Sequence, residues 1–167
     1  QLNNLSTDLL QALTSASIAA IPTAAVAAIS TSQISNFNAS QIDALTSSQI
    51  NALTSDQIAS LTSTQIVGLG GAGVALLTST QISGLGSTQV AGLGTDLIKS
   101  LTTTAIKNLT TDQISYLNSG QVAALTTAQV KSLTLEQLNS LSAENIGAME
   151  TADIAALTTA AIAALKT

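Results

Sequence analysis

The sequence predicts an all-α solenoid, a superhelical coil of very short capped helices with one helix in each eight-residue repeat. Three observations predict it. Twenty-one octads follow one another from residue 1 to residue 167 without insertion or deletion, and only the last is short, by one residue. Each octad carries apolar residues at the same two positions, and a helix start signal directly follows the second. A register kept over this length gives every octad the surroundings of its neighbours, as in a solenoid or fibre.

Two positions of the octad are consistently apolar. We label the positions a to h, with Gln41 at a and Ser48 at h. Position b is Ile, Val or Leu in every copy, and position e is Leu except at Ile21, Ile29, Phe37 and Met149. Position d is usually Ala, Ser or Gly. We therefore expect b and e inside the coil, c, g and h outside, and close approach of successive helices at the small residues of d.

The start of each helix is marked at position f, which is mostly Thr, a residue favoured as an N-cap. Thr46 is followed three residues later by Gln49, which forms the Thr-x-x-Gln capping box, and Leu45 and Ile50 have the spacing of a hydrophobic staple. Acidic residues gather at position h, where they face the positive end of the helix dipole. These signals predict a helix of about six residues in each octad; the acids at h are Asp8, Asp56, Asp96, Asp112, Glu136 and Glu144.

One continuous helix does not fit this pattern. Eight residues at 100° each advance the apolar stripe by about 80° per octad, so no fixed face would be buried. The main alternative is a β-solenoid, which the many Ser and Thr residues favour. However, positions b and e lie three residues apart and would fall on opposite faces of a strand. The segments between them also have low strand propensity. The helical coil is the better interpretation.

The domain organisation follows from the same register. Residues 1–167 form a single array of 21 repeats, within which residues 66–96 are Gly-rich and less regular. The pattern opens at Gln1 and closes at Lys166-Thr167 without the atypical caps that end most solenoids. We therefore expect a segment of a longer chain. In an isolated segment the apolar residues of the first and last octads should be partly exposed, namely Leu2, Leu5, Ile162 and Leu165.

Composition excludes several functional classes. The chain has no Cys and no His, so thiolate chemistry, histidine bases and imidazole metal sites are impossible. A net charge of -5 without a basic run disfavours nucleic acid as a partner. The longest apolar run, Ile66 to Leu77, has 12 residues and is too short to span a bilayer. Because uniform repetition leaves no place unlike the rest, we expect no enzyme activity, no catalytic residue, no metal, no cofactor and no small-molecule substrate.

One segment matches a cofactor-binding motif in residue type and spacing. Gly68-Leu-Gly70-Gly-Ala-Gly73 has the G-x-G-x-x-G spacing of dinucleotide-binding loops, and Asp96 lies at roughly the expected distance for the acidic partner. That motif requires a preceding strand and a βαβ unit. The glycines instead stay in the octad register, with Gly70 at the cap position f. We interpret the segment as a locally flexible part of the array.

The most regular octads resemble a known repeat type. Leu109-Thr-Thr-Asp-Gln-Ile-Ser-Tyr and Leu125-Thr-Thr-Ala-Gln-Val-Lys-Ser are similar to the Leu-Thr-Thr-x-Gln-Ile/Val-x-x octapeptide arrays of large bacterial surface and secreted adhesin-like proteins. The resemblance covers the whole chain and implies a bacterial, extracellular, structural or adhesive role. It supplies no catalytic residue.

Two classes of function remain. The first is a structural segment of an extracellular filament, stalk or surface fibre, with further repeats of the same chain or copies of the chain as partners. The second is binding: an adhesin region, or a solenoid that presents the Thr of position f and the Ser or Thr of position g as a hydroxyl array for a ligand or for ice. The localisation expected for both is extracellular, at the cell surface.

Overall fold

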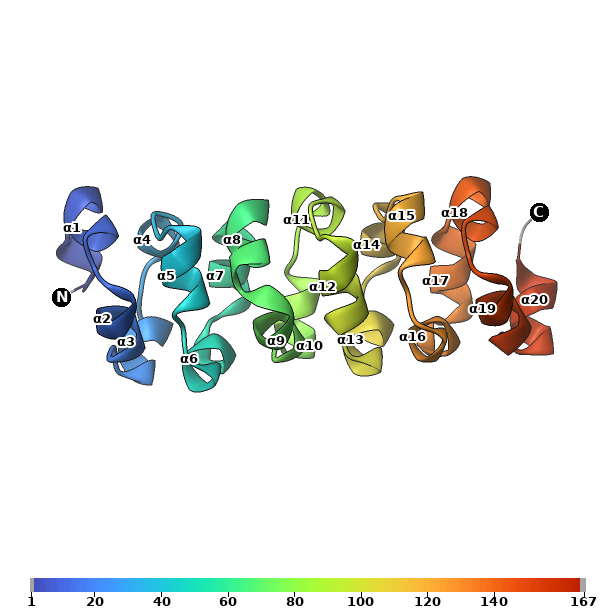
Figure 1. Cartoon of the computed structure of the whole chain (residues 1–167), viewed down its shortest axis with the longest axis horizontal. Helices are drawn as coiled ribbons and strands as arrows, with labels where there is room; N and C mark the ends of the chain where they lie inside the picture. The colour runs from blue at the N-terminus through green and yellow to red at the C-terminus, as the bar shows by residue number, and fades with distance from the viewer. Residues whose placement is uncertain (1, 166–167) are drawn as a thin grey trace.

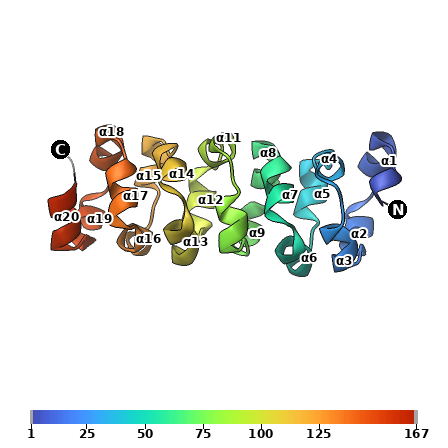
Figure 2. The same cartoon turned by 180° about the vertical axis from the view of Figure 1, so that it is seen from behind.

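The chain forms a rod in which short helices wind around one long axis, as a computed structural model that describes residues 2–165 shows (Figure 1). The two ends of the chain lie at opposite ends of the rod, and the view from behind shows the same uninterrupted winding (Figure 2). Gln1, Lys166 and Thr167, on which the expectation about the chain ends rests, lie outside the described residues.

The prediction of one short helix per octad is confirmed. Between residues 2 and 165 the structure has a 3-10 turn, Leu2–Asn4, and then 20 α-helices of four to six residues, without strands. The helices are α1 (Thr7–Gln11), α2 (Ser15–Ala19), α3 (Thr23–Ala27), α4 (Thr31–Ile34), α5 (Ala39–Asp43), α6 (Ser47–Ala52), α7 (Ser55–Ser60), α8 (Ser63–Gly68), α9 (Gly70–Ala75), α10 (Ser79–Ser83), α11 (Ser87–Ala91), α12 (Thr95–Ser100), α13 (Thr103–Asn108), α14 (Thr111–Ser115), α15 (Ser119–Ala123), α16 (Thr127–Ser132), α17 (Leu135–Ser140), α18 (Ala143–Gly147), α19 (Thr151–Ala156) and α20 (Thr159–Ala164).

The helices begin where the capping signals predict. Thr54, at position f, is extended (φ -76°, ψ 160°), and its hydroxyl accepts a hydrogen bond from the backbone N–H of Gln57. The side chain of Gln57 accepts the return bond from the N–H of Thr54, which completes the capping box. Helix α7 ends at Leu61, which is again extended (φ -72°, ψ 145°) and leads into the next cap. The chain is thus broken and capped again at each Leu-Thr step.

Each turn of the coil contains between three and four octads. Helices pack against the helix three places later in the chain, as α5 does against α8, α3 against α6 and α14 against α17. Side-chain hydrogen bonds reach back 28 to 31 residues, which is slightly less than four octads. Along the upper edge of Figure 1 the helices accordingly follow at every third or fourth place: α1, α4, α8, α11, α15 and α18.

The core lies inside the coil and is made of positions b and e, as the octad pattern predicts. Ile58 and Ile66 at b are fully buried, and Leu53 and Leu61 at e are almost fully buried. The b and e residues of successive turns form one continuous apolar cluster along the rod. Positions c, g and h lie mainly at the surface, also as expected. Helices this short are unstable alone, so this burial holds them in place.

Small residues at position d allow neighbouring turns to approach closely, as expected. A Cβ atom added to Gly92 would lie 2.6 Å from the Cβ of Ser63, four octads earlier. One added to Gly68 would lie 2.9 Å from the carbonyl oxygen of Ala39. Both distances are shorter than a real contact, so a larger residue at these places would push the turns apart.

The Gly-rich residues 66–96 contain helical turns as the other octads do, with one change of geometry. Helix α8 passes almost directly into α9 because Leu69 keeps helical angles (φ -63°, ψ -20°) instead of the extended form. Gly70 then has φ 63°, the only positive φ among residues 2–165. Glycine adopts this conformation without steric cost, whereas the Thr usual at position f would be strained.

The caps can be tested with Thr54→Val, which removes the acceptor for the Gln57 N–H. We expect α7 to lose about 1 kcal/mol of local stability, the usual cost of deleting an N-cap hydroxyl. Hydrogen exchange of the α7 backbone amides measures this loss. Thr64→Val is the matched control, because Thr64 lies exposed within the first turn of α8 and not at its cap. Equal losses in the two variants would contradict the assignment of position f.

Candidate functional site

The distinctive polar feature of the rod is a buried carboxamide at position a, which links each turn to the one before. In Gln57 the side-chain Nε2 donates hydrogen bonds to the carbonyl oxygens of Val26 (2.9 Å) and Ile29 (2.7 Å). Its Oε1 accepts from the N–H of Thr54 (2.8 Å). One side chain thus caps its own helix and bonds the end of a helix four octads earlier.

The same arrangement recurs along the rod, and we call it the amide ladder. Its members are the Gln or Asn side chains at position a that donate to main-chain carbonyl oxygens about 28 residues earlier. They are Gln33, Gln41, Gln49, Gln57, Gln65, Gln81, Gln89, Gln113, Gln121, Gln129, Gln137 and Asn145.

Burial explains why an amide occupies this position. Gln57 and Gln129 are each 2% exposed, so their polar atoms have little access to water. An amide supplies two donors for the two carbonyl oxygens and one acceptor for the cap N–H, which uses both of its polar atoms. A carboxylate could serve the cap but not donate to the carbonyl groups. The ladder therefore requires an amide, although the capping box alone would accept Glu as well as Gln.

We call the hydrogen bonds that one member of the ladder makes to the previous turn a rung. Two residues near the C-terminal end show how a shorter or an acidic side chain changes a rung. Asn145 is one methylene shorter than Gln, and its Nδ2 donates to the carbonyl of Leu117 at 2.7 Å, but its helix α18 has no capping box. Asp153 occupies position a of the next octad and is 2% exposed. Its Oδ1 accepts a hydrogen bond from the hydroxyl of Thr127 at 2.8 Å. This contact still joins α19 to α16 but provides no donor.

Rungs are also missing at Gly73, Leu97, Ala105 and Ala161. For Leu97 the structure gives a reason. By the register of the ladder Leu97 lies opposite Leu69, whose helical angles direct its carbonyl oxygen along α9, where it accepts from the N–H of Gly73 at 3.2 Å. Gly73 is itself crowded, since an added Cβ would lie 3.1 Å from the Cβ of Leu69. The change of geometry at Gly70 thus accounts for these two gaps.

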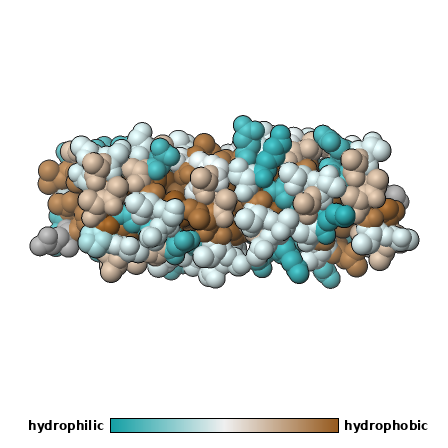
Figure 3. All heavy atoms as spheres, turned by 60° about the horizontal axis from the view of Figure 1, so that its bottom comes forward, coloured by the Kyte–Doolittle hydropathy of each residue, from teal (hydrophilic) through white to brown (hydrophobic). Residues whose placement is uncertain are grey.

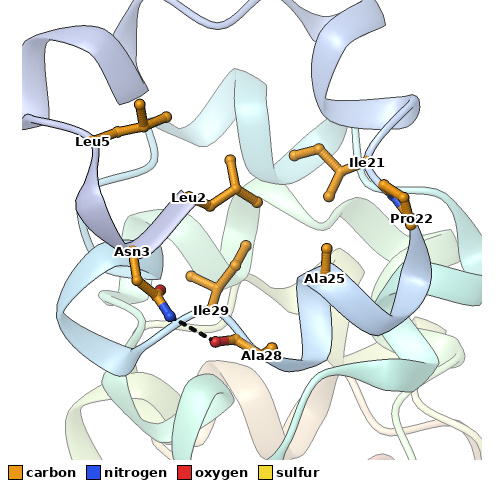
Figure 4. Close-up of a pocket in the computed structure, with 8 residues that line it drawn as sticks. All are labelled: Leu2, Asn3, Leu5, Ile21, Pro22, Ala25, Ala28 and Ile29. Carbon is orange, nitrogen blue, oxygen red and sulfur yellow. Dashed lines mark hydrogen bonds between the residues drawn. The ribbon is translucent and has the colours of Figure 1, made fainter.

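Both cavities described here lie beside an octad with Ala at position a. Near the N-terminal end Ala25 lines an apolar cavity of about 520 Å³, in which Leu2, Ile21 and Ile29 point toward one another (Figure 4). Asn3 closes one side by donating its Nδ2 to the carbonyl of Ala28 at 2.9 Å. Near the other end a cavity of about 310 Å³ is lined in part by Ala161 and Leu133. The apolar residues Leu2, Leu5 and Leu165 of the end octads are partly exposed, as expected, and Ile162 is 47% exposed.

The glycines of the G-x-G-x-x-G segment each have a structural role, of packing at Gly68 and Gly73 and of backbone conformation at Gly70. Gly68 touches the backbone of Ala39, Gly70 supplies the left-handed residue between α8 and α9, and Gly73 fits against Leu69 and Ile50. The segment follows helix α8, whereas a dinucleotide loop follows a strand. Its glycines thus serve the winding of the coil.

The outer surface has few charges, and most of those present suit their helices, although Asp43 lies at the C-terminal end of α5. Asp56 and Asp112 lie in first turns, and Lys99 and Lys131 in last turns, where each charge favours the helix dipole. The pKa of Glu136 is lowered because its carboxylate accepts a hydrogen bond from its own backbone N–H and a second from the Thr134 hydroxyl. The face shown in Figure 3 is mostly pale and brown, with hydrophilic side chains scattered over it.

Within residues 2–165 there is no group of three or more His, Cys, Asp and Glu side chains placed to hold a metal ion. None of the helices in that range has the length and apolar character that crossing a membrane requires.

The amide ladder was only half predicted from the sequence. The capping bond from Gln to the preceding Thr was expected, whereas the bonds from Nε2 to the previous turn were not. A signal for them is present: position a holds Gln in most octads and never Glu, although a capping box tolerates either. That preference indicates a need for a donor at this place.

Comparison with known proteins supports a repeat protein. Residues 26–63, 38–71 and 98–127 match the model of the ALTTAQ repeat family. The six residues of that name occur as Ala124 to Gln129, which include the cap Thr126 and the rung Gln129. No curated protein and no solved structure matches the chain significantly.

The donor role of the ladder can be tested with Gln57→Glu. The new carboxylate keeps the cap acceptor but faces two carbonyl oxygens without a donor, so we expect a loss of about 3 kcal/mol at pH 7. Because the folded protein favours the neutral form of the new carboxyl group, the pKa of that group should be higher in the folded than in the unfolded chain. The loss should therefore be small below the unfolded pKa of about 4.3 and grow as the pH rises through the folded value.

Chemical denaturation at several pH values measures this dependence. Gln11→Glu is the control, because Gln11 lies exposed at the end of α1 and makes no rung. A pH-independent loss in the Gln57 variant, or a similar loss in the control, would refute the donor role of Nε2.

Proposed function

We propose that this chain is a non-catalytic structural segment: a rod that serves as part of a stalk or filament of a bacterial surface fibre outside the cell. The observation that carries the proposal is the amide ladder. Because nearly the same rung joins turn to turn along the rod, length can be set simply by the number of octads. Such a device suits a spacer, whereas a catalyst needs one place unlike all others.

The surface supports the same proposal. Only 8% of the residues are charged, and Ser, Thr, Asn and Ala supply most of the remaining surface positions. Little like-charge repulsion opposes packing of one rod beside or behind another. The partners we propose are further octads of the same chain, or other copies of it. Contacts between the unlike ends of a screw-symmetric rod do not close, so they extend it into a fibre.

Ligand or ice binding by a Thr array is less well supported. The Thr hydroxyls at position f accept backbone N–H bonds at helix starts, as those of Thr54 and Thr126 do. Successive octads also point in different directions, since a turn contains between three and four of them. Their hydroxyls therefore wind around the rod, and only every third or fourth octad presents its Thr on the same edge. An adhesive function would then belong to another part of a surface protein, with this rod as its support.

The spacer proposal can be tested by doubling the array. A chain of 42 octads, made by joining two copies in register, should have the same cross-section as the 21-octad chain and about twice its length. Small-angle X-ray scattering measures both quantities. The control is a chain joined with four extra residues, which breaks the octad register and should produce a bend or a mobile joint. A compact 42-octad particle would refute the spacer.

The location can be tested separately with antibodies raised against the purified chain. Intact producing cells should be labelled, and mild protease treatment should remove the label without cell lysis. An intracellular protein detected only after permeabilisation serves as the control. Labelling that also needs permeabilisation would contradict a surface location while leaving the rod geometry unaffected.

A further inference from the structure

We propose that helices α9–α13, residues 70–108, form a weak section at which the interior of the rod, between Gln33 and Gln137, opens first. The inference begins with the amide ladder. The octads before this section, from Gln33 to Gln65, all carry a rung, and so do those after it from Gln113 to Gln137. Within it, Gln81 and Gln89 make rungs, but Gly73, Leu97 and Ala105 cannot. Three of its five octads therefore lack amide bonds to the previous turn.

The N-caps give a second, independent observation. Helices α5–α8 and α14–α17 all begin with a complete capping box. In the weak section α9, α11 and α12 have no side-chain cap, because the residues that directly precede them are Leu69, Gly86 and Gly94. Their first N–H groups thus lose the side-chain acceptor that other helices have.

The backbone composition acts in the same direction. Seven of the ten glycines lie in residues 70–108, and glycine gains more conformational freedom than other residues when a segment opens. Leu97, which is 8% exposed, offsets part of the loss by apolar burial. Gly73 and Ala105 provide neither an amide nor a large side chain. Fewer bonds and a larger entropy gain both favour local opening here.

The weak section matters if the rod is pulled, a consequence that rests on the proposed function as a stalk. Tension on the two ends is transmitted through every turn, so among the interior turns the one held by the fewest bonds should separate first. Its release would lengthen the stalk by at most about 140 Å, the extended length of this segment. The turns on either side, which have rungs and capping boxes, would keep their helical structure. The section would then act as an extensible element between two stiff halves.

Local opening can be measured by hydrogen exchange on the purified chain. We expect the amides of α9–α13 to exchange about tenfold faster than those of α5–α8 and α14–α17. A reinforced variant should remove most of this difference. It combines Gly86→Thr, Gly94→Thr and Ala105→Gln, which restore two caps and one rung. An added Cβ has room at both glycines: the nearest atom is 3.5 Å away at Gly86, and none lies within 4 Å at Gly94.

The matched control is Gly86→Val, Gly94→Val and Ala105→Met. It adds side chains of similar reach at the same places but neither cap acceptors nor amide donors, so fast exchange should persist. Equal exchange along the wild-type chain would overturn the weak section. A control variant that slows exchange as much as the reinforced one would overturn the assignment to caps and rungs.

Pulling single molecules by their ends tests the response to tension. The wild-type chain should show a first extension step of at most about 140 Å, and the reinforced variant should lose that step. A single step that releases the whole chain would overturn the extensible element. Hydrogen exchange and pulling are both measured on the purified chain. Failure of surface labelling on cells would therefore refute the proposed function without contradicting the weak section.

Discussion

The constraint on which this structure depends is the satisfaction of main-chain groups at the ends of very short helices. A helix of five or six residues has hardly any internal hydrogen bonds, because the first four N–H groups and the last four C=O groups of any helix lack internal partners. Here the Thr hydroxyl and the Gln oxygen serve the start of one helix, and the Gln nitrogen serves the end of another. Apolar burial of Ile and Leu holds these groups close enough to bond. Neither contribution would suffice without the other.

Because each turn needs both the hydrogen bonds at its helix ends and the apolar burial, neighbouring turns depend on one another. The carboxamide that caps a helix is immobilised only when the previous turn presents its carbonyl groups, and those groups are placed by the buried b and e residues of that turn. Each octad is therefore stable only between neighbours, as in other solenoids. The same logic explains why a single change of backbone geometry, at Gly70, is accompanied by changes at Gly73 and Leu97. The position of one carbonyl determines which residue is useful 28 positions later.

Most of the local structure could be predicted from the sequence, because caps, staples and buried positions are encoded within one octad. Thr54, Gln57 and Ile58 have the roles that their spacing indicates. The partners of the Gln57 nitrogen could not be predicted in the same way. An octad repeat is compatible with several numbers of octads per turn, and only that number decides which carbonyl groups come within reach. The left-handed Gly70 was also beyond local rules, since Gly86 and Gly94 occupy the same octad position with ordinary extended angles.

The winding of between three and four octads per turn also bears on how such an array can change during evolution. Gain or loss of whole octads by recombination keeps each Gln facing the b and e carbonyls of some earlier octad, so copy number can drift with little penalty. Insertion of a single residue would displace the rungs of about four octads at once. The matched pair of Leu69 and Leu97 is different, because it tolerates no change of copy number between its members. We expect length variants to accumulate in the uniform halves and to spare the octads between these two residues.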